Sequence, residues 1–270
     1  MSTGAGDFIF YDATRAGPAL FDVSGCRLAA FTAKSPDKVT SNEDCAAWYP
    51  IDERRAVLIV ADGLGGLPYG EEASKLAVAT IVASLAQYEG QEDLRAAILQ
   101  GIDKANEAIL DAGKGGATTL ALIELDEHSV RPYHVGDSVI LVVGQRGRIK
   151  HQTVPHSPTG YAMESGLIDE TDAMNHDERH VVSNVIGSHD MRVEIGPKLP
   201  LARYDTIVIA SDGLADNMRL DQIIDAVRKG NLSDCIQRVA SLCESIMSGD
   251  RDEQPFHPDD LTVLLARRSK

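Results

Sequence analysis

Acidic residues stand at the ends of several apolar segments of this sequence. These residues are Glu43, Asp44, Asp62, Asp137, Asp212, Asp259 and Asp260. No Lys or Arg lies in the short windows of sequence around them. Carboxylates that gather without basic neighbours repel one another at neutral pH, and a divalent cation removes that repulsion. Because the set offers only oxygen ligands, without His or Cys, it favours Mg²⁺ or Mn²⁺ over zinc.

Glycines follow two of these carboxylates. Asp62 begins the segment Asp-Gly-Leu-Gly-Gly, and Asp212 is followed by Gly213. Glycine lets the backbone turn sharply and brings a peptide carbonyl close to a bound ion. A single Asp-Gly pair is equally typical of an ordinary hairpin turn. Two such pairs after apolar runs, together with Asn42-Glu43-Asp44 and Asp259-Asp260, favour a metal centre.

The elements that must position these side chains follow from periodicity. Apolar runs and alternation predict strands at 27–33, 56–61, 118–125, 130–135, 139–143, 148–153, 205–210 and 261–266. Helical spacing predicts helices at 71–88, 93–112, 220–229 and 233–247. Residues 1–24 are predicted to be irregular, and the polar stretch 155–190 a long excursion from the core. This order predicts an α+β domain of antiparallel sheets with helices packed on their faces.

Composition narrows the classes of partner. The 270 residues carry 26 Lys and Arg against 41 Asp and Glu, a formal net charge of −15, with 43% hydrophobic residues. Such a charge repels nucleic acid and anionic lipid, so neither is expected as a partner; solubility alone also explains it. The four cysteines lack zinc-ligand spacing, and neither a signal peptide nor a membrane-spanning run is expected, which indicates a reduced, cytoplasmic setting.

Beyond these residue-level arguments, the sequence resembles the metal-dependent Ser/Thr protein phosphatases of type 2C, in particular the bacterial members. The resemblance extends over nearly the whole chain and keeps the family's motif order. The matching segments are Asn42-Glu43-Asp44, ADGLGGLPYGEEAS (61–74), GATTLAL (116–122), HVGDS (134–138), SGLIDETDAMNHDERHVVSNVIG (165–187), ASDGLADN (210–217) and DDLTVLL (259–265).

The resemblance implies a fold and a reaction. The expected fold is a four-layer α-β-β-α sandwich, with a central antiparallel β-sandwich and a binuclear metal centre at one end. Residues 1–270 would form one catalytic domain, with a mobile flap at about 155–190. The expected activity is hydrolysis of phosphoserine and phosphothreonine in proteins by direct attack of a hydroxide held between two metals, without a phosphoenzyme.

The resemblance also implies roles for individual residues. Asp62 would bridge two Mn²⁺ or Mg²⁺ ions and the Gly63 carbonyl would bind one of them. Asp212 and Asp259 would complete one ligand set, and these two with Asp62 are the expected catalytic residues.

The remaining acids have lesser implied roles. Glu43 would serve the second ion, and Asp44 would hold its neighbours by hydrogen bonds. A third ion would take Asp137 and Asp212, with Asp216 as a possible further ligand.

The sequence departs from the family pattern at four positions. Val39 replaces an Arg that binds phosphate in many relatives, and Leu64 and Val139 replace a His and an Arg. Lys38, next to Val39, either supplies the missing positive charge or is an ordinary surface lysine. Asp260 replaces a frequent Asn and adds negative charge to the site.

Three readings of the function remain open at this level. The first is a phosphatase that opposes a bacterial Ser/Thr kinase, with phosphorylated proteins, the kinase among them, as partners. The second is a regulatory phosphatase dedicated to one phosphoprotein switch. The third is a non-catalytic metal- or partner-binding module. Of the histidines in 155–190, His156, His176 and His180 are predicted to be solvated loop residues, and contact with substrate is the alternative.

Overall fold

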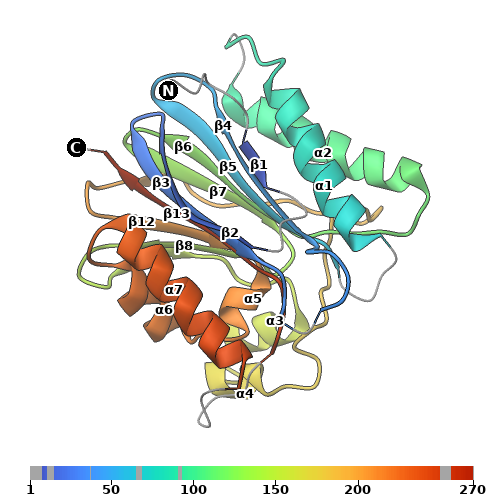
Figure 1. Cartoon of the computed structure of the whole chain (residues 1–270). Coiled ribbons are helices and arrows are strands. Elements are labelled where there is room, and N and C mark those ends of the chain that lie inside the picture. The colour runs from blue at the N-terminus through green and yellow to red at the C-terminus, as the bar shows by residue number, and fades with distance from the viewer. Residues whose placement is uncertain are drawn as a thin grey trace.

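Two antiparallel sheets form the centre of the computed structural model (Figure 1), which describes residues 8–10, 15–36, 38–64, 69–90, 93–249 and 257–269. The first sheet contains, in spatial order, β1 (Phe8–Phe10), β4 (Asp44–Pro50), β5 (Arg55–Asp62), β6 (Leu120–Asp126), β7 (Ser129–Val135) and β10 (Glu194–Ile195), and β11 (Leu199–Pro200) also pairs with β7. The second contains β2 (Arg15–Val23), β3 (Cys26–Ala33), β13 (Leu261–Arg268), β12 (Thr206–Ala210), β8 (Val139–Val143) and β9 (Ile149–Gln152).

Helices cover the outer face of each sheet, as Figure 1 shows. α1 (Gly70–Leu85) and α2 (Leu94–Ala112) pack on the first sheet, and α6 (Leu220–Val227) and α7 (Leu232–Met247) pack on the second. Three short helices lie near one end of the sandwich: α3 (Pro158–Glu164), α4 (Glu170–Met174) and α5 (Asp212–Ala215). The expected four-layer α-β-β-α architecture is therefore confirmed.

Strand β5 shows why its sequence is apolar without a break. Val57, Ile59 and Ala61 join the cluster beneath α1 and α2, whereas Leu58 and Val60 join the cluster between the sheets. Successive side chains of a strand point to opposite faces, so a strand covered on both sides needs apolar residues at every position.

The inner faces of the two sheets change character at one end. On β3, β4, β5, β12 and β13 the side chains that point between the sheets are apolar over most of each strand. They become polar at one end of the sandwich, within the strand or one residue outside it. At that end the inward positions carry Thr32, Asp44, Asp62, Ser211, Asp260 and Thr262. The alternation that builds the core thus delivers polar and acidic side chains to the open end of the sandwich.

The prediction of an irregular segment at 1–24 was wrong, because β1 and β2 lie within it. Among the described strands β2 pairs only with β3, at the edge of the sheet, and its register shifts between Ala16 and Ala19, around Gly17 and Pro18. Proline and a bulge are tolerated at a sheet edge, although they obscure the strand in the sequence. β4 was not predicted either; its short, Ala-rich sequence DCAAWYP lacks alternation because it is nearly all buried.

The four cysteines are buried free thiols. In the part of the chain that the structure describes, no helix has both the length and the apolar character needed to cross a membrane.

Candidate metal centre

The predicted site residues come together in one pocket at the polar end of the sandwich. The pocket has a volume of about 660 Å³. Its lining includes every residue predicted to bind a metal: Glu43, Asp62, Gly63, Asp137, Asp212, Asp216 and Asp259. Lys38 and Asp260 also line it, whereas Asp44 lies behind the wall. Segments from five distant parts of the sequence therefore build a single acidic site.

The backbone around Asp62 is fixed by hydrogen bonds from neighbouring segments. The Asp62 carbonyl accepts from the Thr119 N–H at 2.8 Å and from the Thr118 hydroxyl at 2.8 Å. The next residue, Gly63, donates its N–H to the Glu43 carbonyl at 3.1 Å. A Cβ at Gly63 would lie 2.3 Å from the Gly70 carbonyl oxygen, so only glycine allows α1 to begin this close to the strand end.

Burial and mutual repulsion keep these carboxyl groups away from their ordinary ionisation. Burial, then the charge of Asp137, raises the pKa of Asp212 to about 7. Burial raises the pKa of Asp137 to about 6, and its Oδ1 atom is buried without a hydrogen-bond partner. For Asp62, burial and the charges of Asp212 and Asp44 raise the pKa well above its usual value.

A hard divalent cation fits this arrangement. The pocket offers several carboxylates, Gly63 contributes backbone to its lining, and the unpartnered Oδ1 of Asp137 is available as a ligand. Binding of a cation would satisfy these oxygens and reverse the repulsion that raises their pKa values. Asp216, whose pKa burial and Asp212 also raise, lies in the same pocket and adjoins the predicted third site.

Asp44 is anchored behind the pocket. Its side chain is 2% exposed, and Oδ2 accepts a 2.7 Å hydrogen bond from the Ser211 hydroxyl. Ser211 also accepts the N–H of Thr262 at 3.0 Å, so one hydroxyl joins β4, β12 and β13. The Oδ1 atom of Asp44 is buried without a partner, and burial together with Asp260 raises its pKa. Asp44 is thus joined through Ser211 to the backbone of Thr262.

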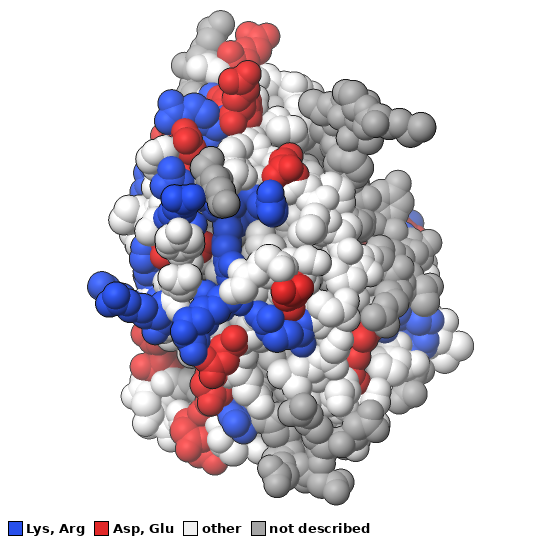
Figure 2. All heavy atoms as spheres, turned by 60° about the vertical axis from the view of Figure 1, so that its left-hand side comes forward, with Lys and Arg blue, Asp and Glu red and all other residues white. Residues whose placement is uncertain are grey.

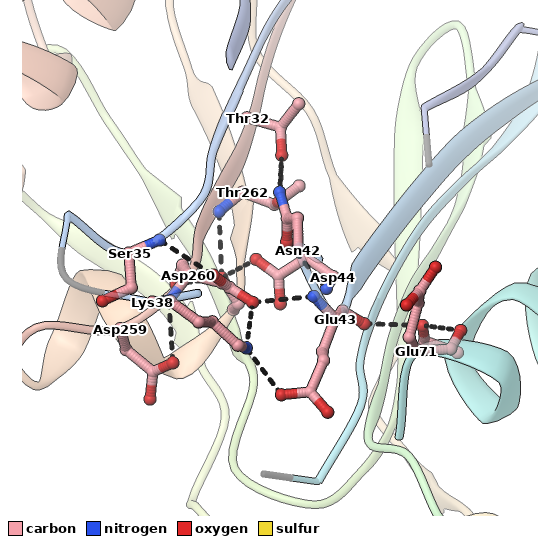
Figure 3. Close-up of polar contacts among 12 residues, drawn as sticks. Thr32, Ser35, Lys38, Asn42, Glu43, Asp44, Glu71, Asp259, Asp260 and Thr262 are labelled. Carbon is pink, nitrogen blue, oxygen red and sulfur yellow. Dashed lines mark hydrogen bonds and ion pairs between the residues drawn. The ribbon is translucent and has the colours of Figure 1, made fainter. Parts of the chain in front are cut away.

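Lys38 lies between two carboxylates of the site, as Figure 3 shows. Its Nζ atom is 2.5 Å from Glu43 Oε2 and 2.6 Å from Asp260 Oδ2. Asp260 is 2% exposed and also accepts the N–H groups of Glu43 at 2.7 Å and Ser35 at 2.8 Å. Lys38 is 19% exposed, so it is an ion-paired residue of the pocket wall rather than an ordinary surface lysine.

His156 is a residue whose setting the sequence did not reveal. It was predicted to be a solvated loop residue, but it is 6% exposed. Its Nδ1 accepts the Gly136 N–H at 3.1 Å, and its own N–H donates to the Gly136 carbonyl at 2.9 Å. His156 thereby fixes the turn that carries Asp137. The contact joins segments 20 residues apart, and no local sequence pattern signals it.

A second group of possible ligands does not favour a metal. His134, His156 and Glu194 bring one ligand atom each within 4.8 Å of one another. Since Nδ1 of His156 accepts from Gly136, its Nε2 carries the proton and donates to Glu194 at 3.3 Å. The His134 and His156 rings stack at 24°, so their lone pairs do not converge on one ion. The group instead ties β10 and the 155–190 segment to β7.

A smaller cavity of about 290 Å³ adjoins the metal pocket and shares Asp137, Asp212 and Asp216 with it. Its other walls are mainly apolar and come from β8, α3, α4 and α6, with Met163 and Met174 among them. The segment 155–190 therefore covers one side of the site with α3 and α4.

Comparison with known proteins gives a consistent result. The sequence profile described as protein phosphatase 2C matches residues 37–246. The serine/threonine phosphatase stp of Listeria monocytogenes is 28% identical over 238 residues, which cover 84% of this chain and 90% of that protein. The protein phosphatase PhpP of Streptococcus pneumoniae is 27% identical over 199 residues, covering 70% of this chain and 80% of that protein.

Solved structures share the fold. The Staphylococcus aureus serine/threonine phosphatase Stp1 superposes with a TM-score of 0.78 at 24% identity and covers 90% of this chain and 95% of its own. The catalytic domain of the phosphatase PstP, solved with two manganese ions, gives a TM-score of 0.71 at 24% identity and covers 90% and 97%. Since the family profile covers most of the sequence and the fold agrees, the chain belongs to the protein phosphatase 2C family.

Proposed function

We propose that this protein is a metal-dependent phosphatase that hydrolyses phosphoserine and phosphothreonine in other proteins. The observation that carries the proposal is the pocket in which Glu43, Asp62, Asp137, Asp212 and Asp259 meet. The names of the relatives in Listeria and Streptococcus support this substrate class. The intact set of carboxylates weighs against a non-catalytic binding module.

The proposed ligand set is the one that the family resemblance implies for the acids of this pocket. The charges of Asp212, Asp44, Asp259 and Asp137 all act on Asp62. Asp62 would be shared by two cations, with the Gly63 carbonyl, Asp212 and Asp259 on one and Glu43 on the other. Asp137, Asp212 and Asp216 would hold a third, weaker ion. Bound Mn²⁺ or Mg²⁺ would lower the pKa of a coordinated water and neutralise charge on the phosphoryl oxygens.

The remaining residues of the site orient these groups. Asp44 accepts a hydrogen bond from Ser211 and would thereby fix the end of β4 that lies opposite Asp62. Asp260 holds the backbone of Glu43 and the Lys38 ammonium, so Lys38 adds a fixed positive charge to the pocket wall. We propose that this charge attracts the substrate phosphate, in place of the Arg that is Val39 here. The leaving group would take its proton from solvent, since Leu64 cannot supply one.

The finer points are also proposals. The manganese in the PstP structure supports Mn²⁺ for this site, and Mg²⁺ has the same ligand preference. The substrates would be phosphoproteins in the cytoplasm, including a Ser/Thr kinase, and the four free thiols are in keeping with that compartment.

Phosphate release from synthetic peptides tests the proposal. With Mn²⁺ or Mg²⁺ the protein should hydrolyse p-nitrophenyl phosphate and phosphothreonine peptides, and EDTA should abolish both. A phosphotyrosine peptide of the same sequence is the control and should be the poorer substrate. Full turnover in EDTA, or rescue by Zn²⁺ alone, would refute the metal assignment.

A further inference from the structure

A cationic surface lies at the end of the sandwich opposite the metal pocket. It surrounds the junction of α6 and α7, the β8–β9 turn and the end of β13, and Figure 2 shows Lys and Arg side chains gathered on the face that contains it. The cationic surface consists of Arg146, Arg148, Arg228, Lys229, Arg238 and Arg267.

Contacts within the structure hold these residues next to one another. Arg238 donates to the Lys229 carbonyl at 2.8 Å, and Arg267 donates to the carbonyl of Gly230. The Arg228 side chain packs beside the β8–β9 turn, because a Cβ at Gly147 would be 3.7 Å from Arg228 Cδ. The turn, the helix junction and the strand end therefore form one continuous surface.

Part of this surface has a structural role. Arg238 bonds the carbonyls of Ala226 and Lys229, and Arg267 those of Val227 and Gly230, so both cap the C-terminal end of α6. Arg228 pairs with Asp225 at 2.7 Å.

Capping does not account for the other three residues. Arg146, Arg148 and Lys229 are exposed, and within the described ranges none of them forms an ion pair with a carboxylate. A chain with a net charge of −15 thus presents unpaired cations on one local surface.

The cationic surface is distant from the metal pocket. Strand β13 connects them, from Leu261 beside Asp260 to Arg268 next to Arg267. Eight residues at about 3.3 Å each span roughly 25 Å. Because β13 is buried between two hydrophobic clusters, a bound peptide would have to run over the outer surface. A segment of ten or more extended residues is therefore needed to reach from one site to the other.

We propose that the cationic surface docks an Asp- or Glu-rich segment of the phosphoprotein substrate. Exposed guanidinium groups bind carboxylates in a paired geometry, which suits such a segment. Screening limits charge interactions to about 8 Å in physiological salt, so a narrow peptide would contact mainly these cations. A bilayer or a nucleic-acid duplex is larger and would also meet the acidic surface around them. The inference rests on the proposed phosphatase function.

Two phosphothreonine peptides test the docking. One carries eight Glu residues about ten positions from the phosphothreonine, and the other carries Gln at the same positions. The variant Arg146→Glu/Arg148→Glu removes charge from the cationic surface. The control Arg95→Glu/Lys104→Glu changes exposed residues of α2 on the opposite layer and alters the net charge equally.

For the wild type and the control, KM for the Glu peptide should be about tenfold lower than for the Gln peptide at low salt. The variant Arg146→Glu/Arg148→Glu should lose this difference, with turnover of p-nitrophenyl phosphate unchanged. Equal KM values in the wild type, or an unchanged difference in the variant, would overturn the proposal.

Binding of the unphosphorylated Glu peptide, followed by fluorescence anisotropy, separates docking from catalysis. If p-nitrophenyl phosphate is not turned over but the Glu peptide binds through Arg146 and Arg148, the proposed function fails and the docking surface stands. Binding of phosphatidylserine vesicles or duplex DNA in place of the Glu peptide would overturn the choice of partner.

Discussion

Asp44 and Asp62 are opposite partners in the antiparallel pairing of β4 with β5. Both side chains lie on the face of their strand that points between the sheets. Asp44 shares that face of β4 with Ala46 and Trp48, and Asp62 shares that face of β5 with Leu58 and Val60. Residues opposite each other across a strand pair lie about 5 Å apart, and like charges there are destabilising. Only Asp44 has a hydroxyl partner, Ser211. The fold thus creates an electrostatic conflict that a divalent cation at Asp62 would resolve.

Removing one charge should stabilise the metal-free protein. In EDTA at pH 8, Asp212→Asn should raise the Tm by at least about 3 °C, since relief of about 1 kcal/mol shifts the Tm of a chain this size by roughly that much. The reason is that burial and Asp137 disfavour the Asp212 carboxylate. Asp103→Asn, at an exposed position in the middle of α2, is the control and should not change the Tm. A lower Tm for Asp212→Asn in EDTA would contradict the predicted repulsion.

Metal affinity should depend on pH near neutrality. Folding raises the pKa of Asp212 to about 7 and that of Asp137 to about 6, so in the absence of metal both groups favour the fold when protonated. Their contribution is complete below about pH 4 and is lost as the pH rises through 6 to 7. Metal binding must displace these protons. Calorimetry should show weaker Mn²⁺ binding and greater proton release at pH 6 than at pH 8; pH-independent affinity would refute this.

Lys38→Ala should affect both stability and substrate binding. Hydrogen bonds to Asp260 and Glu43 outweigh burial and raise the pKa of Lys38, so the ammonium is charged at any working pH. Its removal leaves the buried Asp260 carboxylate without its cation, at a cost of about 2 kcal/mol or more. KM for a phosphopeptide should rise with a smaller change in kcat.

The double variant Lys38→Ala/Asp260→Asn separates the two roles of Lys38. It should recover the Tm because the unpaired buried charge is gone, while KM stays high because the cation is still absent. Lys34→Ala is the matched control and should change neither. If KM does not move in Lys38→Ala, the residue only stabilises the pocket wall and another group binds phosphate.

Asp137→Ala should remove the weak third ion and leave two tight sites. Asp137 follows Gly136, whose N–H and carbonyl both bond to His156. The Oδ1 atom of Asp137 is buried without a hydrogen-bond partner. Metal titration by calorimetry should lose the weak step, and turnover should fall markedly. A lower Tm with the same number of bound ions would mean that Asp137 serves only the turn.

The layers and most strands were predictable from the sequence because each has a local signature. The run at 56–61 and the helical spacing at 71–88 reappear as β5 and α1. The strands that escaped prediction lack such a signature. β2 contains Gly17 and Pro18 at a sheet edge, and β4 is too short and too fully buried to alternate.

The acids that line the pocket could be predicted because an acid at the end of an apolar run is visible in the sequence itself. The contacts that hold those acids could not. Lys38 and Asp260 are 222 residues apart, and Ser211 and Asp44 are 167 apart. Such partners are brought together only by the pairing of the sheets. The short windows of sequence around the acids contain no Lys or Arg, so they did not indicate that Lys38 pairs with Glu43 and Asp260.

If Asp62 holds the cations of a metal centre that hydrolyses phosphate esters, replacing its charge should abolish turnover. The most direct test is phosphate release from a phosphothreonine peptide, measured for wild-type protein and Asp62→Asn across the same Mn²⁺ titration. The wild type should reach full turnover as Mn²⁺ is added. Asp62→Asn should stay folded by circular dichroism and show almost no turnover at any Mn²⁺ concentration. Turnover by Asp62→Asn close to that of the wild type would contradict the account.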